Sequence, residues 1–116
     1  MRNKKLALLQ SLQQQYRRLS GSLAGIGYIS QGSVLDRSTL RRPRSGYQWT
    51  RKVAKKTITV ALSPEQFQAV GKAIENRRKL AKTLTKMEKI SRRILFSSLP
   101  DTSRRKPLNK NVLQTV

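Results

Sequence analysis

The chain lacks the two side chains that most often carry thiol and proton-transfer chemistry. Cys and His are both absent from its 116 residues. Their absence excludes disulfides, thiolate nucleophiles, zinc sites of the finger or ribbon type and histidine-based acid–base catalysis. A large share of enzyme mechanisms is therefore closed to this sequence.

Acidic residues are scarce as well as scattered. The chain has five of them, Asp36, Glu65, Glu75, Glu88 and Asp101. Their wide separation suggests no carboxylate cluster for Mg²⁺, which an autonomous nuclease or polymerase needs. We therefore expect a protein that is not an enzyme and that has no metal and no cofactor.

Long apolar runs are also missing. No run approaches the ~20 residues of a membrane-spanning helix, and "LALL" near the start is too short for the apolar part of a signal peptide. An acid-poor, basic start is also compatible with an organellar transit peptide. The main expectation is no membrane and a cytoplasmic location, in association with the nucleoid or with ribonucleoprotein.

Positive charge is what the chain has in excess. Its 26 Lys and Arg residues give a formal net charge of +21 at pH 7. A compact chain with that charge repels itself unless a partner neutralises it. Nucleic acid, an anionic membrane surface and an acidic protein all fit, and a strongly basic domain is most typical of phosphate binding.

The length suits one small domain with extensions. Residues 1–20 have apolar side chains three or four positions apart, which predicts a helix that ends at Ser20 and Gly21. Its expected packing stripe consists of Leu6, Leu9, Leu12, Tyr16 and Leu19. Residues 21–31 are rich in glycine and predict a linker, with a short strand at Tyr28–Ile29.

Residues 32–63 have the alternation of β-strands. A first short strand is expected in "GSVLDRS", and "GYQWTRKV" and "KTITVALS" alternate between apolar and polar residues. A tight hairpin centred on Lys55–Lys56 places Val53 opposite Ile58 and Trp49 opposite Leu62. That register gathers the large apolar groups on one face of an antiparallel sheet.

The segment "SPEQ" predicts the start of a long helix, with Ser63 as the cap and Pro64 in the first position. The helix is expected to run to about Ser97. Its first part, with Phe67, Val70 and Ile74, is expected on the sheet. Its second part, with Leu80, Leu84, Met87 and Ile94, pairs either with the N-terminal helix or with another chain, and the sequence leaves both open. The fold class is thus α+β, with a core region at 32–97 and a basic tail at 98–116 that is disordered or ordered by a partner.

The polar face of the hairpin is the predicted binding surface, because a β-ribbon can enter a major groove where Gln and Arg reach bases and Thr and Lys reach phosphates. Phosphate contacts are expected from Arg41, Arg42, Arg44, Lys52, Lys55 and Lys56, with Arg37 beside them and Gln48 and Thr50 nearest the bases. Thr59 belongs to the same row, although β-propensity alone explains a Thr there.

Further cations are expected to supplement this face. On the long helix they are Arg77, Arg78 and Lys82, for which a phosphate contact and an ordinary solvated face are left open. In the tail they are Arg104 and Arg105, expected to form a nonspecific electrostatic anchor. Tyr47 and Trp49 alternate onto the apolar face, so we expect them in the core, with stacking on unpaired bases as the alternative.

The order of motifs between residues 32 and 95 resembles a known family. It runs "GSV", "GYQWTRKVAKKT", "LSPEQ" and "ENRRKL", and it is similar to small bacterial and archaeal proteins often encoded beside transposases, whose function is not established. Members often have cysteines where this chain has "STLRRPRS", so the resemblance implies no metal site here. The expected architecture also resembles, more loosely, the arm-binding domain of tyrosine recombinases, which lays its sheet in the major groove.

The sequence thus predicts a nonenzymatic nucleic-acid-binding protein, an accessory subunit of a mobile-element nucleoprotein complex. One alternative is a structural component of a ribonucleoprotein, ribosomal or associated with guide RNA, which neutralises phosphates without reading bases. Another is an interaction protein whose helices form a coiled coil with a partner. The sequence does not distinguish DNA from RNA.

Overall fold

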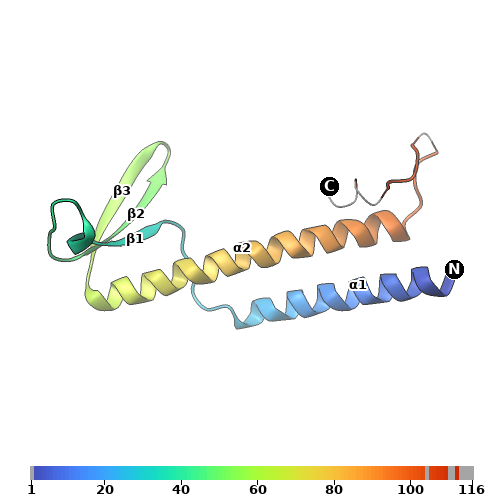
Figure 1. Ribbon diagram of the computed structural model, residues 1–116, viewed down its shortest axis with the longest axis horizontal. Helices are drawn as coiled ribbons and strands as arrows, with labels where there is room; N and C mark the ends of the chain where they lie inside the picture. Colours follow the sequence, from blue (N-terminus) through green and yellow to red (C-terminus); the bar gives the residue numbers. More distant parts are fainter. Residues whose placement is uncertain (1, 104, 110–111, 113–116) are drawn as a thin grey trace. The chain divides into compact units, whose positions relative to one another are not determined.

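The structure is a computed structural model that describes residues 2–103, 105–109 and 112. Its elements are helix α1 (Arg2–Ser22), a 3₁₀ turn η1 (Leu23–Gly25), strand β1 (Ser33–Asp36), a 3₁₀ turn η2 (Arg37–Thr39), strands β2 (Tyr47–Val53) and β3 (Lys56–Leu62), and helix α2 (Pro64–Ser98) (Figure 1). The expected α+β fold is confirmed: an N-terminal helix, a small antiparallel sheet and a long C-terminal helix.

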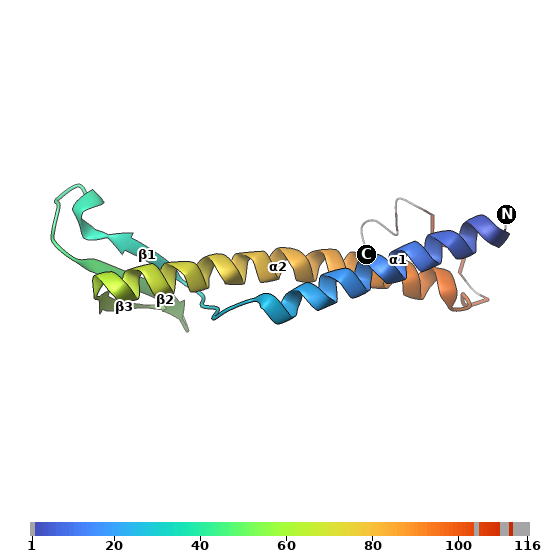
Figure 2. The same cartoon turned by 90° about the horizontal axis from the view of Figure 1, so that it is seen from below.

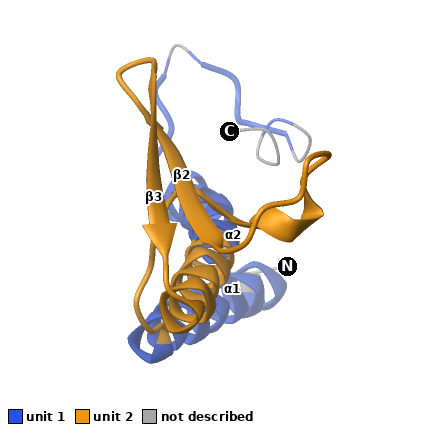
Figure 3. Ribbon diagram, turned by 90° about the vertical axis from the view of Figure 1, so that its left-hand side faces the viewer, with its two compact units in different colours: residues 1–25, 81–116 blue, residues 26–80 orange. Residues whose placement is uncertain are grey.

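The chain divides into two compact units, shown in different colours in Figure 3. Unit 2 is residues 26–80 and contains the sheet and the first half of α2. Unit 1 is residues 1–25 and 81–116, and contains α1, the second half of α2 and the tail. Each unit is described by itself below.

In unit 2 the three strands form an antiparallel sheet in the order β1-β2-β3. Trp49 lies between Val34 on β1 and Val60 on β3, and Thr50 lies between Ser33 and Thr59. Because neighbours across strands share a face of the sheet, Val34, Trp49 and Val60 are on one face. The polar row with Thr50 is on the other face, so the predicted division into an apolar and a polar face is correct.

The predicted hairpin register is wrong by two residues. Val53 pairs with Lys56, and Trp49 pairs with Val60 rather than with Leu62. The turn is therefore centred on Ala54 and Lys55, which have φ of 48° and 68°. Positive φ at both central residues is the type I′ combination that matches the twist of a two-residue hairpin. A shift of two residues leaves every side chain on the expected face.

Neither Ala54 nor Lys55 suits this turn, because a left-handed backbone costs a residue with a Cβ roughly 1–2 kcal/mol. We expect the double substitution Ala54→Asn, Lys55→Gly to stabilise unit 2 by about 1 kcal/mol, since Asn-Gly is the favoured type I′ pair. Thermal unfolding followed by circular dichroism measures this, with Lys55→Ala as the control that removes the charge and keeps the strain. An unchanged or lower melting temperature for the double variant contradicts this account of the turn.

The start of α2 has Ser63 as its cap, as the sequence predicts, and Gln66 completes a capping box. The Ser63 hydroxyl accepts from the Gln66 backbone N–H at 3.1 Å, and the Gln66 side-chain oxygen accepts from the Ser63 N–H at 3.0 Å. Two N–H groups that a helix end leaves without partners are thereby satisfied. This reciprocal pair fixes where β3 ends and α2 begins, and so where α2 meets the sheet.

The first turns of α2 cover only one end of the apolar face. The Phe67 ring stacks on the Tyr47 ring, with centroids 4.3 Å apart, and Gly71 lies against Val34. Ala73 and Ile74 are the buried side chains of this unit. Towards the hairpin tip, by contrast, Ile58 and Val60 are 43% and 44% exposed. The apolar face thus extends beyond the part that α2 covers.

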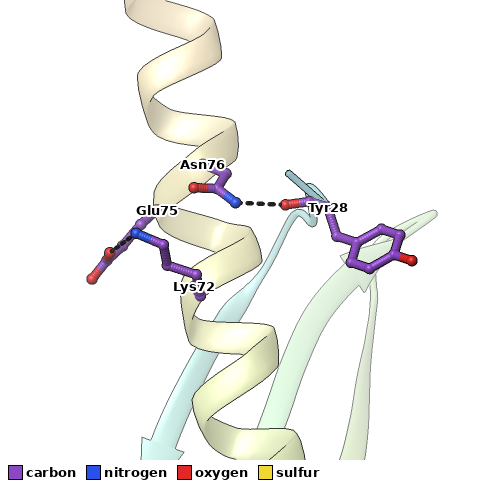
Figure 4. A network of polar contacts seen from close by, with 4 residues as sticks. All are labelled: Tyr28, Lys72, Glu75 and Asn76. Atoms are coloured by element: carbon purple, nitrogen blue, oxygen red, sulfur yellow. Dashed lines mark hydrogen bonds and ion pairs between the residues drawn. The ribbon is translucent and has the colours of Figure 1, made fainter. Parts of the chain in front are cut away.

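The segment between η1 and β1 is attached to α2 by polar contacts. The Asn76 side-chain N–H donates to the Tyr28 carbonyl at 3.0 Å (Figure 4), and the Ser30 N–H donates to the Ala73 carbonyl at 3.2 Å. The expected strand at Tyr28–Ile29 is wrong, because residues 26–31 form no strand. Their backbone bonds to the helix rather than to a sheet.

In unit 1, α1 lies beside the second half of α2 in both Figure 1 and Figure 2. The most buried side chains there are Leu12 on α1 and Met87 on α2. Of the two arrangements that the sequence left open, the structure shows pairing within the chain. The expected stop at Ser20 and Gly21 is wrong, since α1 continues to Ser22. No proline or other obligatory helix breaker stands at these positions.

Two leucines do not lie where the predicted stripes put them. Leu6 of α1 is 54% exposed and Leu84 of α2 is 41% exposed. Thr83 rather than Leu84 is the partly buried position of that turn. Two helices in contact cover only a narrow seam of each other, so the flanks of each apolar stripe stay open.

The tail contains contacts within the described residues. The Arg105 guanidinium donates to the Asp101 carboxylate at 2.6 Å and lies over the Phe96 ring. Arg104 lies outside the described residues.

Candidate nucleic-acid interface

The face of the sheet opposite Tyr47 and Val34 is not covered by α2. Its side chains come from all three strands, and alternation assigns to it Ser33, Leu35, Gln48, Thr50, Lys52, Thr57, Thr59 and Ala61. Lys52, Thr57 and Thr59 are exposed, whereas Gln48 and Thr50 are half-buried. We call this set the polar face. It carries three predicted polar contacts and one predicted cation on a single surface.

Hydroxyl groups form a row across the polar face. The Ser33 and Thr50 hydroxyls are 3.0 Å apart and share a hydrogen bond, and Thr59 pairs with Thr50 on the far side. Each hydroxyl offers one donor and two acceptor positions. The row therefore presents short, fixed groups of the kind that contact phosphate oxygens or base edges.

Arg37 is linked directly to Gln48. Its Nε donates to the Gln48 side-chain oxygen at 3.2 Å. This contact occupies one of the two acceptor positions of the amide oxygen and leaves the N–H₂ group as donor. Gln48 is therefore oriented to donate to an acceptor such as guanine O6 or N7.

The loop between β1 and β2 is closed at its base. The Arg37 N–H donates to the Gly46 carbonyl at 3.0 Å, and the Arg37 carbonyl accepts from the N–H groups of Leu40 and Arg44. Gly46 has φ of 98°, a conformation that favours glycine. We call residues 37–46 the arginine loop. Its backbone is held by its own hydrogen bonds rather than by packing.

Asp36 fixes the first turn of this loop. Its carboxylate accepts from the Ser38 hydroxyl at 2.7 Å and from the Ser38 N–H at 3.0 Å. Because both bonds favour the charged form, they lower the pKa of Asp36 below its ordinary value. The carboxylate is thus ionised at neutral pH and engaged with Ser38. The interaction is present above the ordinary Asp pKa and disappears as the pH falls through the lowered value.

The cations of the arginine loop have no acidic partner among the described residues. Arg41, Arg42 and Arg44 are exposed, and the ion pairs among the described residues are Lys72–Glu75, Arg92–Glu88 and Arg105–Asp101. Unit 2 has twelve Lys and Arg residues against three acidic residues, a formal charge of +9. Most of its positive charge is therefore available to an anionic partner.

The two lysines of the hairpin tip are placed differently. Lys55 is a central residue of the turn, whereas Lys56 pairs with Val53 and belongs to the apolar side of the sheet. Lys56 remains at the hairpin tip, where the sequence places it, and its phosphate contact stays a prediction. A turn at Ala54–Lys55 makes Lys56 the first residue of β3.

Arg77 is the helix cation that the structure brings to the sheet. It lines a hollow of about 470 Å³ together with Thr50, Arg51, Lys52 and Thr57 of β2 and β3 and with Gln31, Gly32 and Ser33 before and in β1. The sequence indicated Arg77, Thr50 and Lys52 but missed Arg51, which alternates onto the apolar side. The pairing of β1 with β2 stops at Ser33 and Thr50. The residues of β2 after Thr50 therefore have no neighbouring strand on the side of β1.

The remaining predicted cations lie elsewhere. Arg78 lines a second hollow of about 480 Å³ with Lys72 and Glu75, Lys82 is an exposed residue of α2 in unit 1, and Arg105 is engaged by Asp101. Arg78 therefore lines a different hollow from Arg77, and the phosphate contacts of Lys82 and Arg105 stay predictions. Sequence reasoning also missed Tyr28, whose ring is 93% exposed.

No family model, no curated protein and no solved structure matches this chain. The site therefore has to be interpreted from its own geometry and charge.

Two further observations concern the part of the chain that the structure describes. Its residues include no group of three or more Asp or Glu side chains placed to hold a metal ion. None of its helices combines the length and the apolar character that crossing a membrane requires.

Proposed function

We propose that this protein is a nonenzymatic nucleic-acid-binding protein that uses the polar face and the arginine loop. The observation that carries the proposal is the uncovered polar face in a unit of charge +9, in which the ion pairs engage only Lys72 among the cations. The positive charges of such a surface repel one another, and bound phosphate groups reduce this repulsion. Release of the counterions around the nucleic acid then drives binding.

The contacts divide by chemistry. Arg41, Arg42 and Arg44 contact phosphates, because they are exposed on a loop whose base is fixed. Lys52 adds a phosphate contact from the sheet. Gln48 donates to base edges, since Arg37 holds its amide oxygen. Phosphate contacts set the position of the protein and base contacts set sequence preference.

Duplex is the favoured form of nucleic acid. Proteins that bind single strands stack bases on aromatic side chains. In this sheet the aromatic residues are engaged on the other side, with Tyr47 stacked on Phe67 and the Trp49 indole N–H donating to the Gln31 carbonyl. The polar face has hydrogen-bonding groups and no aromatic ring. Tyr28 is the exposed aromatic that single-strand binding would use.

The mobile-element setting rests on the resemblance of residues 32–95 alone. In that setting the protein is an accessory subunit of a transposition or recombination complex, and its nucleic acid is DNA. A structural role in a ribonucleoprotein uses the same cations but needs no donor aimed at base edges. The fixed amide of Gln48 favours the first setting.

Competition binding across a salt series tests the proposal, with duplex DNA, single-stranded DNA and structured RNA as competitors. If the three loop arginines and Lys52 each neutralise one phosphate, log K on duplex DNA falls with log salt with a slope of about −3.6, which is 0.9 per neutralised phosphate. We expect duplex DNA to compete best.

Two outcomes contradict the proposal in different ways. Weak binding of all three competitors that salt does not change removes nucleic acid as the partner. A preference for single strands that Tyr28→Ala abolishes moves the binding surface from the polar face to the segment before β1. A preference for structured RNA supports the ribonucleoprotein alternative.

A further inference from the structure

The hollow beside Arg77 brings together cations from a strand and a helix. Arg51 and Lys52 are consecutive on β2 and project to opposite faces of the sheet, yet both line the hollow because it lies at the open edge of β2. Arg77 enters from α2. Thr50 and Thr57 add hydroxyl groups. With the hydroxyl of Ser33, three positive charges and three hydroxyls surround one space.

The wall of this hollow formed by residues 31–33 is held in place. The Trp49 indole N–H donates to the Gln31 carbonyl at 2.9 Å. Gly32 has φ of 97°, and a Cβ there would lie 2.5 Å from both the Thr50 carbonyl oxygen and the Trp49 indole nitrogen. Only glycine permits this approach. The Ser30–Ala73 hydrogen bond joins the same segment to the helix that carries Arg77.

The charges of the hollow are not neutralised by any acidic residue of unit 2. Glu75 pairs with Lys72, the Asp36 carboxylate is bonded to Ser38, and Glu65 lies in the first turn of α2. None of these carboxylates lines the hollow. Three like charges held together by a fixed backbone repel one another, and an anion with several oxygens would remove that repulsion.

We propose that this hollow is a phosphate-binding site. Arg77 presents the planar guanidinium fork that pairs with two phosphate oxygens at once, Lys52 supplies a point charge, and the Thr hydroxyls donate to the remaining oxygens. Its volume of about 470 Å³ exceeds the need of one phosphate and accommodates a phosphodiester with part of its sugar. This inference rests on the proposed function, and the ligand that it assigns to the hollow is a backbone phosphate of the bound nucleic acid.

The assignment gives α2 a part in binding. The arginine loop starts where β1 ends, at Asp36, whereas the hollow lies where β1 begins, at Ser33. Phosphate contacts at both ends of the polar face hold the backbone on either side of Gln48. Contacts of this kind fix the register of a protein on its nucleic acid.

The test compares Arg77→Ala with Lys79→Ala. Both residues are exposed and lie two positions apart on α2, and each substitution removes one positive charge, but only Arg77 lines the hollow. We expect Arg77→Ala to lower the salt slope on duplex DNA by ~0.9, equally for unrelated sequences, and Lys79→Ala to lower it by clearly less. Arg77→Lys should restore part of the slope, because it keeps the charge and loses the fork.

A second measurement separates this inference from the proposed function. Titration of the wild-type chain with inorganic phosphate, followed by NMR of the backbone amides, should shift the signals of Gly32, Thr50 and Lys52, and Arg77→Ala should abolish these shifts. Phosphate-induced shifts without any binding of nucleic acid support the phosphate site and remove the proposed function. The site is wrong under one combination of results: nucleic acid binds, the two Ala variants have equal salt slopes, and added phosphate changes none of these amide signals. If Arg77→Ala abolishes the phosphate-induced shifts but has the same salt slope as Lys79→Ala, the site binds a free phosphate or a phosphomonoester. The backbone of the nucleic acid is then ruled out as its ligand.

Discussion

Replacing Arg41, Arg42 and Arg44 together by Ala is expected to reduce the slope of log K against log salt on duplex DNA by about 2.7, which is 0.9 for each phosphate that is no longer neutralised. All three side chains are exposed on the arginine loop and have no acidic partner among the described residues. The backbone of the loop is held by Arg37, Gly46 and Asp36. The substitutions therefore remove charge and keep the hydrogen bonds that fold the loop, and equilibrium binding at four or five salt concentrations measures the slope.

A charge-matched control is available on α1. Lys4, Arg17 and Arg18 are exposed residues of that helix, and replacing them by Ala changes the formal charge by the same three units. We expect this control to lower affinity slightly and to change the slope far less than the loop variant does. Equal slopes for the two variants mean that net charge, and not the loop, determines binding. An unchanged slope in the loop variant rules the loop out as a phosphate-binding segment.

The elements of the fold were predictable because each depends on local chemistry. Alternation with period two assigned the faces of β2 and β3, and the Ser63–Gln66 capping box determined where α2 starts. The length of α2 followed from a run of helix-forming residues without proline after Pro64. None of these features requires knowledge of what packs against what.

The hairpin register was not predictable by the same means. Ala54 and Lys55 have no sequence preference for positive φ, so nothing in the sequence indicates a type I′ turn at these two residues. Both possible turns put the same side chains on the same face, and alternation cannot separate them. The error changes which residues pair across the hairpin and makes Lys56 the first residue of β3, but it changes the face of no side chain.

The candidate site was predictable in part. The polar face and the arginine loop follow from alternation and composition. The hollow depends instead on contacts between distant segments: Gln31 with Trp49, and Ser30 with Ala73. These contacts bring Arg77 to the edge of β2, where Arg51 also lines the space. Alternation along β2 assigns Arg51 to the apolar side of the sheet. It cannot indicate that a residue of α2 lies beside Arg51.

Trp49 determines whether the sheet holds its shape, and Trp49→Ala is expected to lower the free energy of unfolding by about 3 kcal/mol. This is the lower end of the range for truncating a Trp in a core, because Trp49 is half-buried. The substitution removes a ring that contacts Gly32 and the donor that holds the Gln31 carbonyl. For a small domain such a loss lowers the melting temperature by roughly 12–24 °C, at 4–8 °C per kcal/mol. Calorimetry measures it without relying on indole fluorescence.

Trp49→Phe separates packing from the hydrogen bond. Phe keeps an aromatic ring beside Val34 and Val60 but cannot donate to Gln31, so we expect a loss of about 1 kcal/mol, the typical net value of one hydrogen bond. Because the Gln31 carbonyl belongs to the wall of the hollow, the same variant should weaken the phosphate-induced shift of Gly32. One result would reverse the assignment of Trp49 to the core. If the Trp49→Ala variant keeps its melting temperature and loses binding to single strands, the indole of the wild-type protein stacks on bases, and the sheet is stabilised by Tyr47 and Phe67 instead.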